Sequence, residues 1–135
     1  MMEAYSSRDS IGYTRLFDAA YLGQSLNPID PINPRIEFDW PDEQRHIQAL
    51  AEKATITAVN LNFGSSLALF HDLGDPPGWA TIQTSAMQLE ILDGADVFRT
   101  PAYVLEEFKF IPTTPDAASS TDTTWKIIRW TEIAP

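Results

Sequence analysis

The sequence predicts one α+β domain, in which helices are followed by a curved antiparallel sheet of about five or six strands. Apolar residues recur at helical spacing in the first part of the chain, and from residue 55 onward the apolar period changes to two. The chain has 135 residues, of which 44% are hydrophobic, so one core can be built. Residues 1–135 are therefore predicted to be a single domain, with the helices packed on one face of the sheet.

Two helices are predicted before the strands. Residues 5–21 carry apolar side chains at spacings of three to five, which predicts a helix capped by Asp9 or Ser10. The prolines of residues 27–34 predict a loop, and a short extended run follows over 35–40. A second helix is predicted over 41–53, because Pro41 suits a first helical position and acids follow it. Its apolar stripe consists of Ile47, Leu50, Ala51 and Ala54.

The remaining chain predicts strands and turns. Alternation predicts a strand over 58–63, and a short strand over 67–70 precedes the loop HDLGDPPG. Three long strands are predicted over 79–92, 97–111 and 124–133. DGAD between the first two predicts a tight hairpin turn, and the polar stretch PTTPDAASSTDT predicts a flexible excursion at the end of a hairpin.

The last predicted strand contains WKIIRW, which is apolar on both faces. Simple alternation places Trp125 and Ile127 on one face and Ile128 and Trp130 on the other. The helices are expected to cover one of these faces. We expect a second copy of the chain to cover the other, as a homodimer through the sheet.

Composition excludes several classes of function. The chain has 19 acidic and 9 basic residues, a net charge of −10, and no basic cluster that would bind a nucleic acid. No run approaches the ~20 apolar residues of a membrane span, and the first residues lack the pattern of a signal peptide. Because the chain has no cysteine, disulfides and thiolate chemistry are excluded, and the compartment stays open.

The order of these segments resembles the superfamily of nuclear transport factor 2, the cone-roll or cystatin-like α+β proteins, which includes ketosteroid isomerase and polyketide cyclases. The resemblance rests on YSSRDSIGYTRLFDAAY, the mid-chain helix, GWATIQTSAMQLEIL, DVFRTPAYVLEEFKFIP and the closing WKIIRWTEI, and covers nearly the whole chain. It implies a conical pocket closed by helices and a homodimer through the sheet. Within the superfamily, the chain is most similar to uncharacterised domains of bacterial lipoproteins and secreted proteins. Family members have a longer helix before a pair like Arg8-Asp9, so we expect a truncated first helix and any export signal or lipid anchor upstream of Met1.

A site like that of ketosteroid isomerase is disfavoured by the resemblance itself. That enzyme moves a proton with a carboxylate, while a tyrosine and a neutral Asp stabilise the enolate. Tyr13, Asp39 and Asp96 offer these residue types. Alignment with the family from the Arg8-Asp9 turn, however, places the catalytic base at Gln24 or Ser25, which carry no carboxylate. We expect Tyr13 to pack on a helix face and both Asp residues to lie in solvated turns.

Three side chains are candidates for acid–base chemistry, although no catalytic role is assigned. His46 precedes the buried-looking Ile47, so it is expected at the surface or at the rim of the pocket. Glu106 and Glu107 point to opposite faces of a strand, and a buried one would have a raised pKa. Because Glu is seldom fully buried, we expect both at a solvated strand edge.

No metal or cofactor site is predicted. His71, Asp72 and Asp75 form H-D-x-x-D, but catalytic zinc needs about three well-spaced ligands, so a turn with solvated acids is favoured. The sequence contains no nucleophile elbow, phosphate-binding glycine loop or nucleotide fingerprint.

Large aromatic residues can line an apolar pocket or fill a core. We expect Tyr21, Trp40, Trp79 and Phe108 to line a ligand pocket, with core packing as the alternative.

Three functions follow from the sequence. The first is a non-enzymatic homodimeric domain that binds a small apolar ligand. The second is a small isomerase, cyclase or dehydratase that uses Glu106, Glu107 or His46. The third is a structural accessory domain of a cell-envelope protein. A titratable side chain inside the pocket, within reach of a second polar group, would indicate an enzyme, whereas a pocket filled by the protein's own aromatic residues would indicate a structural domain.

Overall fold

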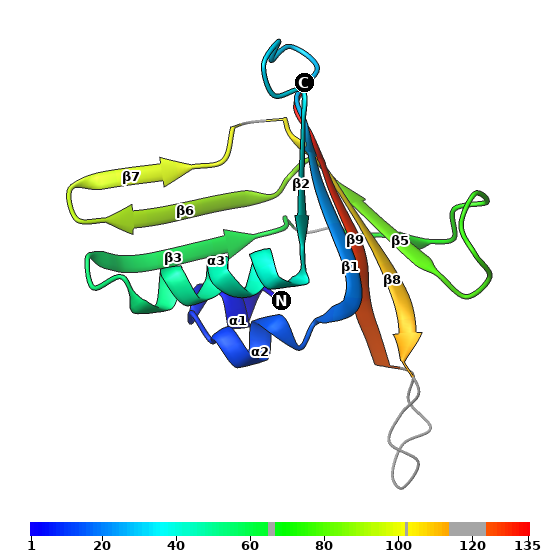
Figure 1. Ribbon diagram of the computed structural model, residues 1–135, viewed down its shortest axis with the longest axis horizontal. Coiled ribbons are helices and arrows are strands. Elements are labelled where there is room, and N and C mark those ends of the chain that lie inside the picture. Colours follow the sequence, from blue (N-terminus) through cyan, green and yellow to red (C-terminus); the bar gives the residue numbers. More distant parts are fainter. Residues whose placement is uncertain (65–66, 102, 114–123) are drawn as a thin grey trace, which may run out of the picture.

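A computed structural model of the chain describes residues 1–64, 67–101, 103–113 and 124–135. Within them the helices are α1 (Met2–Ser6), α2 (Ser10–Thr14) and α3 (Trp40–Glu52). One sheet has the strand order β2-β1-β9-β8-β5-β4 and another the order β3-β6-β7 (Figure 1). The predicted α+β class is confirmed. The strands are β1 (Phe17–Leu26), β2 (Arg35–Asp39), β3 (Ile56–Asn62), β4 (Leu69–Phe70), β5 (Ala80–Thr84), β6 (Gln88–Asp93), β7 (Asp96–Arg99), β8 (Leu105–Thr113) and β9 (Thr124–Ile133).

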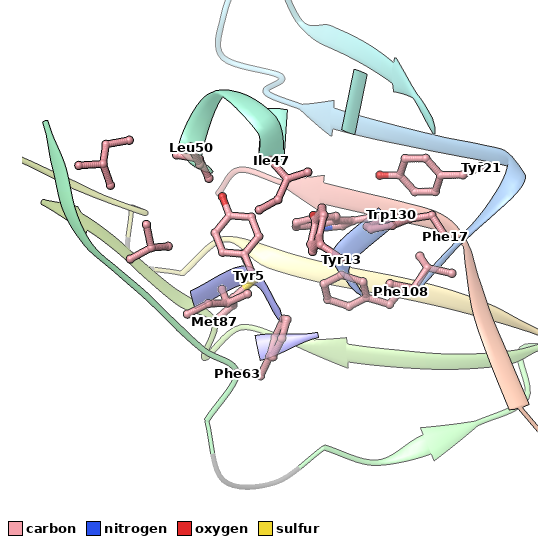
Figure 2. Packing of buried hydrophobic residues seen from close by; sticks show 14 residues of the cluster. Tyr5, Tyr13, Phe17, Tyr21, Ile47, Leu50, Phe63, Met87, Phe108 and Trp130 are labelled. Atoms are coloured by element: carbon pink, nitrogen blue, oxygen red, sulfur yellow. The ribbon is translucent and has the colours of Figure 1, made fainter. Parts of the chain in front are cut away.

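The core lies on one face of the six-stranded sheet. In Figure 1 the three-stranded sheet and all three helices lie on this side, and α3 and α1 pack against strands β1 and β3. Aromatic side chains of the six-stranded sheet, such as Phe17 and Trp130, meet aromatic side chains of the helices, such as Tyr5 and Tyr13, in this core (Figure 2). Tyr5, Tyr13, Phe17 and Tyr21 form a series of edge-to-face contacts, with ring centroids 4.7 to 5.2 Å apart.

The predicted first helix over 5–21 is wrong in its second half. Helix α2 ends at Thr14, and strand β1 begins at Phe17 and pairs in parallel with β9, so the sheet is mixed rather than antiparallel. Asp9 does cap α2, by accepting a hydrogen bond from the backbone of Gly12. Apolar residues four apart suit a helix, but pairing with β9, more than 100 residues away in sequence, outweighs this local preference.

Two of the predicted long strands are each divided between the two sheets. The segment 79–92 becomes β5 in the large sheet and β6 in the small one, and 97–111 becomes β7 and β8. The change of sheet after β5 is fixed by Thr84, whose hydroxyl donates to the carbonyl of Phe63 and accepts from the amide of Ala86. The tight hairpin at DGAD is confirmed, with Gly94 at φ 60° between β6 and β7. Most of the predicted polar excursion, residues 114–123, lies outside the described residues.

A bulge in β9 changes the prediction for WKIIRW. Phe110 pairs with Ile127 but Lys109 pairs with Arg129, so Ile128 is an extra residue in the ladder. Ile127 and Trp130 therefore both point into the core, although simple alternation places them on opposite faces.

The outer face of the six-stranded sheet is polar. Lys109 forms ion pairs with Asp72 and Asp75, and the guanidinium of Arg129 lies 6.0 Å from the centre of the Trp79 ring. A homodimer through the sheet stays a prediction, and the partner would have to accommodate these charges. In the part of the chain that is described, no helix is both long and apolar enough to span a membrane.

Candidate functional site

A cavity of about 480 Å³ opens between helix α3 and strands β2, β6 and β9. Its wall combines apolar surface with several titratable side chains, and the protein's own aromatic residues do not fill it. Such a combination is typical of a binding or active site. The lining residues are Tyr5, Ile36, Glu37, Phe38, Asp42, Glu43, His46, Leu61, Met87, Leu89, Thr100, Trp130 and Glu132.

The start of helix α3 fixes one wall of the cavity. Asp39 and Asp42 form a reciprocal capping box, and Pro41 follows in the first turn. Glu43 and His46 are three residues apart, so both side chains lie on the same face of the helix. The capped first turn therefore places a carboxylate and an imidazole side by side on the cavity wall.

Glu43 is a buried carboxylate held by two tyrosines. Its side chain is only 5% exposed, and it accepts hydrogen bonds from the hydroxyl of Tyr13 at 3.1 Å and of Tyr21 at 2.9 Å. Burial raises the pKa of Glu43, and the two tyrosine hydrogen bonds oppose this increase. Burial, together with the field of Glu43, also raises the pKa of both tyrosines, so they stay protonated donors.

His46 and Tyr5 form a hydrogen-bonded pair at the cavity wall. The hydroxyl of Tyr5 lies 2.6 Å from Nε2 of His46, and the two rings stack with centroids 5.7 Å apart. The His46 side chain is accessible from the cavity, yet the surrounding protein atoms lower its pKa by desolvation, which favours the neutral imidazole. Burial raises the pKa of Tyr5. In the tautomer that carries its proton on Nδ1, the neutral His46 accepts the hydrogen of the Tyr5 hydroxyl at Nε2.

Glu106 is buried, which corrects the expectation of a solvated strand edge. It is 2% exposed and accepts a hydrogen bond of 2.6 Å from the indole Nε1 of Trp130. Burial raises the pKa of Glu106 to about 7, with a contribution from the charge of Glu132. Glu107 points to the outer face, where it accepts a hydrogen bond from Gln83 and lies 3.8 Å from Lys109.

The four aromatic residues expected in a ligand pocket lie in different places. Tyr21 is buried and holds Glu43, while Trp40 donates from its indole to the carbonyl of Thr14 and ties α3 to the end of α2. Trp79 lies on the outer face against Arg129. None of these three lines the cavity beside α3.

Phe108 lines a second cavity, of about 260 Å³, whose wall is almost entirely apolar. Phe108 packs on Trp130 at 5.0 Å between ring centroids, so these two side chains form part of the wall that separates the two cavities.

Other candidates serve the fold. Asp39 caps α3, and Asp96 lies in the β6–β7 hairpin. Asp72 and Asp75 form ion pairs with Lys109 and do not form a site with His71. The His71 ring forms a hydrogen bond with the carbonyl of Trp79. Within the described ranges, no group of three or more His, Cys, Asp or Glu side chains could hold a metal ion.

Sequence reasoning missed Glu43, Glu132 and Tyr5. A signal for Glu43 was present, because it precedes Ile47 by four residues and Leu50 by seven, and so lies on the same stripe as the apolar residues of α3. Glu132 has no comparable signal, because its place depends on the register of β9 with both neighbouring strands.

No family model matches this sequence, and no curated relative matches it significantly. Solved structures do match across nearly the whole chain. A candidate scytalone dehydratase from Novosphingobium aromaticivorans is 9% identical, with a TM-score of 0.64 over 97% of this chain and 74% of that one. The chain has the fold of the NTF2-like superfamily. An NTF2-like superfamily protein from Salmonella enterica is 11% identical, with a TM-score of 0.63 over 99% and 82% of the two chains. An NTF2-like protein of unknown function in nutrient uptake from Rhodospirillum rubrum is 10% identical, with a TM-score of 0.62 over 98% and 90%.

These similarities confirm the fold that the resemblance implied. The expected closeness to lipoprotein or secreted domains stays a prediction. Proteins of this fold include one described as a dehydratase and others of unknown function, so the fold does not decide between binding and catalysis. The decision must come from the residues in the cavity.

Proposed function

We propose that the chain is an enzyme that binds a small, uncharged, largely apolar carbonyl compound beside α3 and moves a proton on it, as in an isomerase or dehydratase. The hydrogen bond between Tyr5 and His46 at the wall of an unfilled cavity carries this proposal. It places a titratable side chain within reach of a second polar group inside a pocket, which is the arrangement that acid–base catalysis requires.

The Tyr5–His46 pair can accept a proton without charging the phenol. As the Tyr5 oxygen takes a proton from a carbon acid, its own proton moves to Nε2 of His46, 2.6 Å away. The products are a neutral tyrosine, an imidazolium and a substrate enolate. Desolvation lowers the pKa of His46, so the imidazole is ready to receive this proton near neutral pH.

The acidic side chains of the cavity wall favour an uncharged ligand over an anionic one. Glu37, Asp42, Glu43 and Glu132 line it, and no Lys or Arg does so among the residues that the structure describes. Carboxylates and phosphates would be repelled by this wall, whereas a neutral ring can pack on Phe38 and Trp130. A protein of the same fold is described as a candidate scytalone dehydratase, which supports a dehydratase as one of the two reaction types proposed.

The experiment uses 3-hydroxyindan-1-one, a neutral bicyclic β-hydroxy ketone. Exchange of its α-protons for deuterium is followed by NMR in D₂O at pD 7 with the wild type and with His46→Gln. We expect the protein to accelerate exchange, and His46→Gln to reduce that acceleration by about 100-fold, in the range of general base catalysis.

His71→Gln is the matched control, because His71 lies on an exposed loop outside the cavity, and its side chain forms a hydrogen bond with the carbonyl of Trp79. It should leave exchange unchanged. Saturable binding of the ketone without exchange would contradict the enzyme and support a binding domain. Neither binding nor exchange would contradict both.

A further inference from the structure

Two carboxylates face each other across strands β8 and β9. Glu106 pairs directly with Glu132 in the antiparallel register, and two residues along the same strands Phe108 pairs with Trp130. Directly paired residues lie on the same face of a sheet with Cβ atoms about 5 Å apart, so both carboxyl groups point to the core side. Trp130 and Glu132 line the cavity, and Glu106 lies behind them, bonded to the Trp130 indole.

Neither carboxyl group has a basic partner among the ion pairs of the described residues. Glu106 has the Trp130 indole, and Glu132 has Ser25, its parallel partner on β1, as a hydrogen-bonding neighbour. Two such charges at this separation repel each other strongly where water is excluded. Holding one proton between the two groups removes this repulsion.

We propose that Glu106 and Glu132 share one proton, and that Glu132 delivers it to an oxygen of the ligand as the acid that complements the Tyr5–His46 base. This inference rests on the proposed function and adds the reaction class, elimination of water from a β-hydroxy carbonyl compound. Glu132 is the catalytic acid because it lines the cavity. Glu106 is a positioning residue that acts through Glu132.

The proton balance of this elimination is complete without a co-reactant. One proton leaves the α-carbon for Tyr5 while the Tyr5 proton moves to His46. The C–O bond at the β-carbon breaks, and the departing oxygen takes the proton from Glu132 and leaves as water. A carbon–carbon double bond forms. The proton on His46 then returns to the carboxylate pair through solvent.

Burial raises the pKa of both groups, and that of Glu106 reaches about 7, so the pair holds a proton near neutral pH. Glu132 in turn acts on the groups across the cavity, because its charge raises the pKa of Tyr5, Tyr21 and Glu43. The titratable groups that face the pair from the surrounding elements are Tyr5 of α1, Tyr21 of β1, Glu37 of β2, and Asp42, Glu43 and His46 of α3.

The kinetic test separates two steps on the same probe, 3-hydroxyindan-1-one. Exchange at the α-carbon needs the base, whereas elimination to indenone also needs an acid for the hydroxyl group. Glu132→Gln should reduce elimination by about 100-fold and change exchange by less than about threefold. Equal losses in both steps would overturn Glu132 as the acid and leave the proposed function standing.

Glu106→Gln tests the shared proton, since the amide oxygen can still accept from Trp130. The wild-type pair loses its shared proton at about the raised pKa of Glu106, whereas Glu132 alone has no second carboxyl group with which to share a proton. We therefore expect the alkaline limb of the elimination profile to move about one pH unit toward acid. Glu107→Gln, one residue along on the outer face, should leave the profile unchanged. An unchanged profile in Glu106→Gln would overturn the proposal.

A titration that needs no substrate keeps the two proposals distinguishable. Carboxyl ¹³C shifts of labelled glutamate should show Glu132 titrating about one unit lower in Glu106→Gln than in the wild type. If Glu132 titrates identically in both, the shared proton is refuted whatever the activity. If the shift is seen but the wild type catalyses no exchange, the pair is real and the proposed function fails.

Discussion

Glu106 and Glu107 are adjacent on strand β8, yet they lie in opposite environments. Glu106 is buried against Trp130 and opposite Glu132, and burial raises its pKa to about 7. Glu107 lies on the outer face with Gln83 and Lys109. Since neighbouring residues of a strand point to opposite faces, a single step in sequence separates them.

This contrast extends over both faces of the six-stranded sheet. On the outer face, acids such as Asp72 and Asp75 are compensated by Lys109. On the core side of the sheet, Glu43 of α3 is held by tyrosine hydroxyls and Glu106 of β8 by an indole, and these groups donate hydrogen bonds but carry no positive charge. Hydrogen bonds from Gly74 and Lys109 lower the pKa of Asp72, whereas burial raises the pKa of Glu43 and of Glu106 and so increases their affinity for protons, the property that acid–base chemistry needs.

The largest effect is expected for the inner-face residue Phe108. It is 3% exposed and packs on Phe63 and Trp130, so Phe108→Ala removes a large buried side chain from the wall between the two cavities. We expect a loss of about 3–5 kcal/mol in the free energy of unfolding, measured in urea. A loss below about 1 kcal/mol would show that this wall is not packed as the structure has it.

The second prediction concerns the pH dependence of stability. Because folding raises the pKa of Glu106 from 4.5 to about 7, its stabilising contribution is complete below pH 4.5 and is lost as the pH rises to 7. Glu106→Gln removes this loss. It should therefore be more stable than the wild type at pH 8, by up to about 3 kcal/mol.

Urea unfolding at pH 4.5 and pH 8 measures this difference. Glu107→Gln serves as the matched control and should follow the wild type at both values. Parallel pH profiles for Glu106→Gln and the wild type would refute the raised pKa of Glu106.

A smaller effect is expected when one hydrogen bond to Glu43 is removed. Tyr21→Phe leaves this buried carboxylate with Tyr13 alone, at a cost of about 1–3 kcal/mol. The lost hydrogen bond favoured the anion, so the pKa of Glu43 rises further and the cost should be larger at pH 8 than at pH 5. Chemical denaturation at the two pH values measures this loss in the free energy of unfolding. An equal loss at both pH values would contradict a hydrogen bond that favours the anionic form of Glu43.

The smallest effect is expected on the outer face. Glu107→Gln keeps an acceptor for Gln83 and weakens only a long contact with Lys109. Its free energy of unfolding should change by less than about 1 kcal/mol, and by less still in 0.5 M salt. A change as large as that of Phe108→Ala would remove the contrast between the two faces.

The sequence predicted the elements whose signals are local. Pro41 and the acids after it located α3, the DGAD turn located the β6–β7 hairpin, and the last strand was placed at 124–133 as found. The failures at β1 and in the last strand depend on distant partners. Strand β1 is set by β9, and the inward direction of both Ile127 and Trp130 by a bulge against β8, neither of which leaves a local pattern.

The candidate site was predictable only in part. His46 and Glu106 were identified as acid–base candidates from residue type, but their neighbours were not. Tyr5 reaches His46 across 41 residues, and Glu106 meets Glu132 through strand register. Aromatic residue type alone did not separate Trp130 in the cavity from Trp79 on the outer face.

The indole N–H signals of the tryptophans test the central claim most directly, because Trp130 lines the cavity beside α3, Trp125 lines the apolar cavity and Trp79 lies on the outer face. Titration of ¹⁵N-labelled protein with indan-1-one should shift the Trp130 signal in a saturable way and leave the Trp79 and Trp125 signals in place. A saturable shift of Trp125 alone, or no shift at all, would contradict the cavity beside α3 as the functional site.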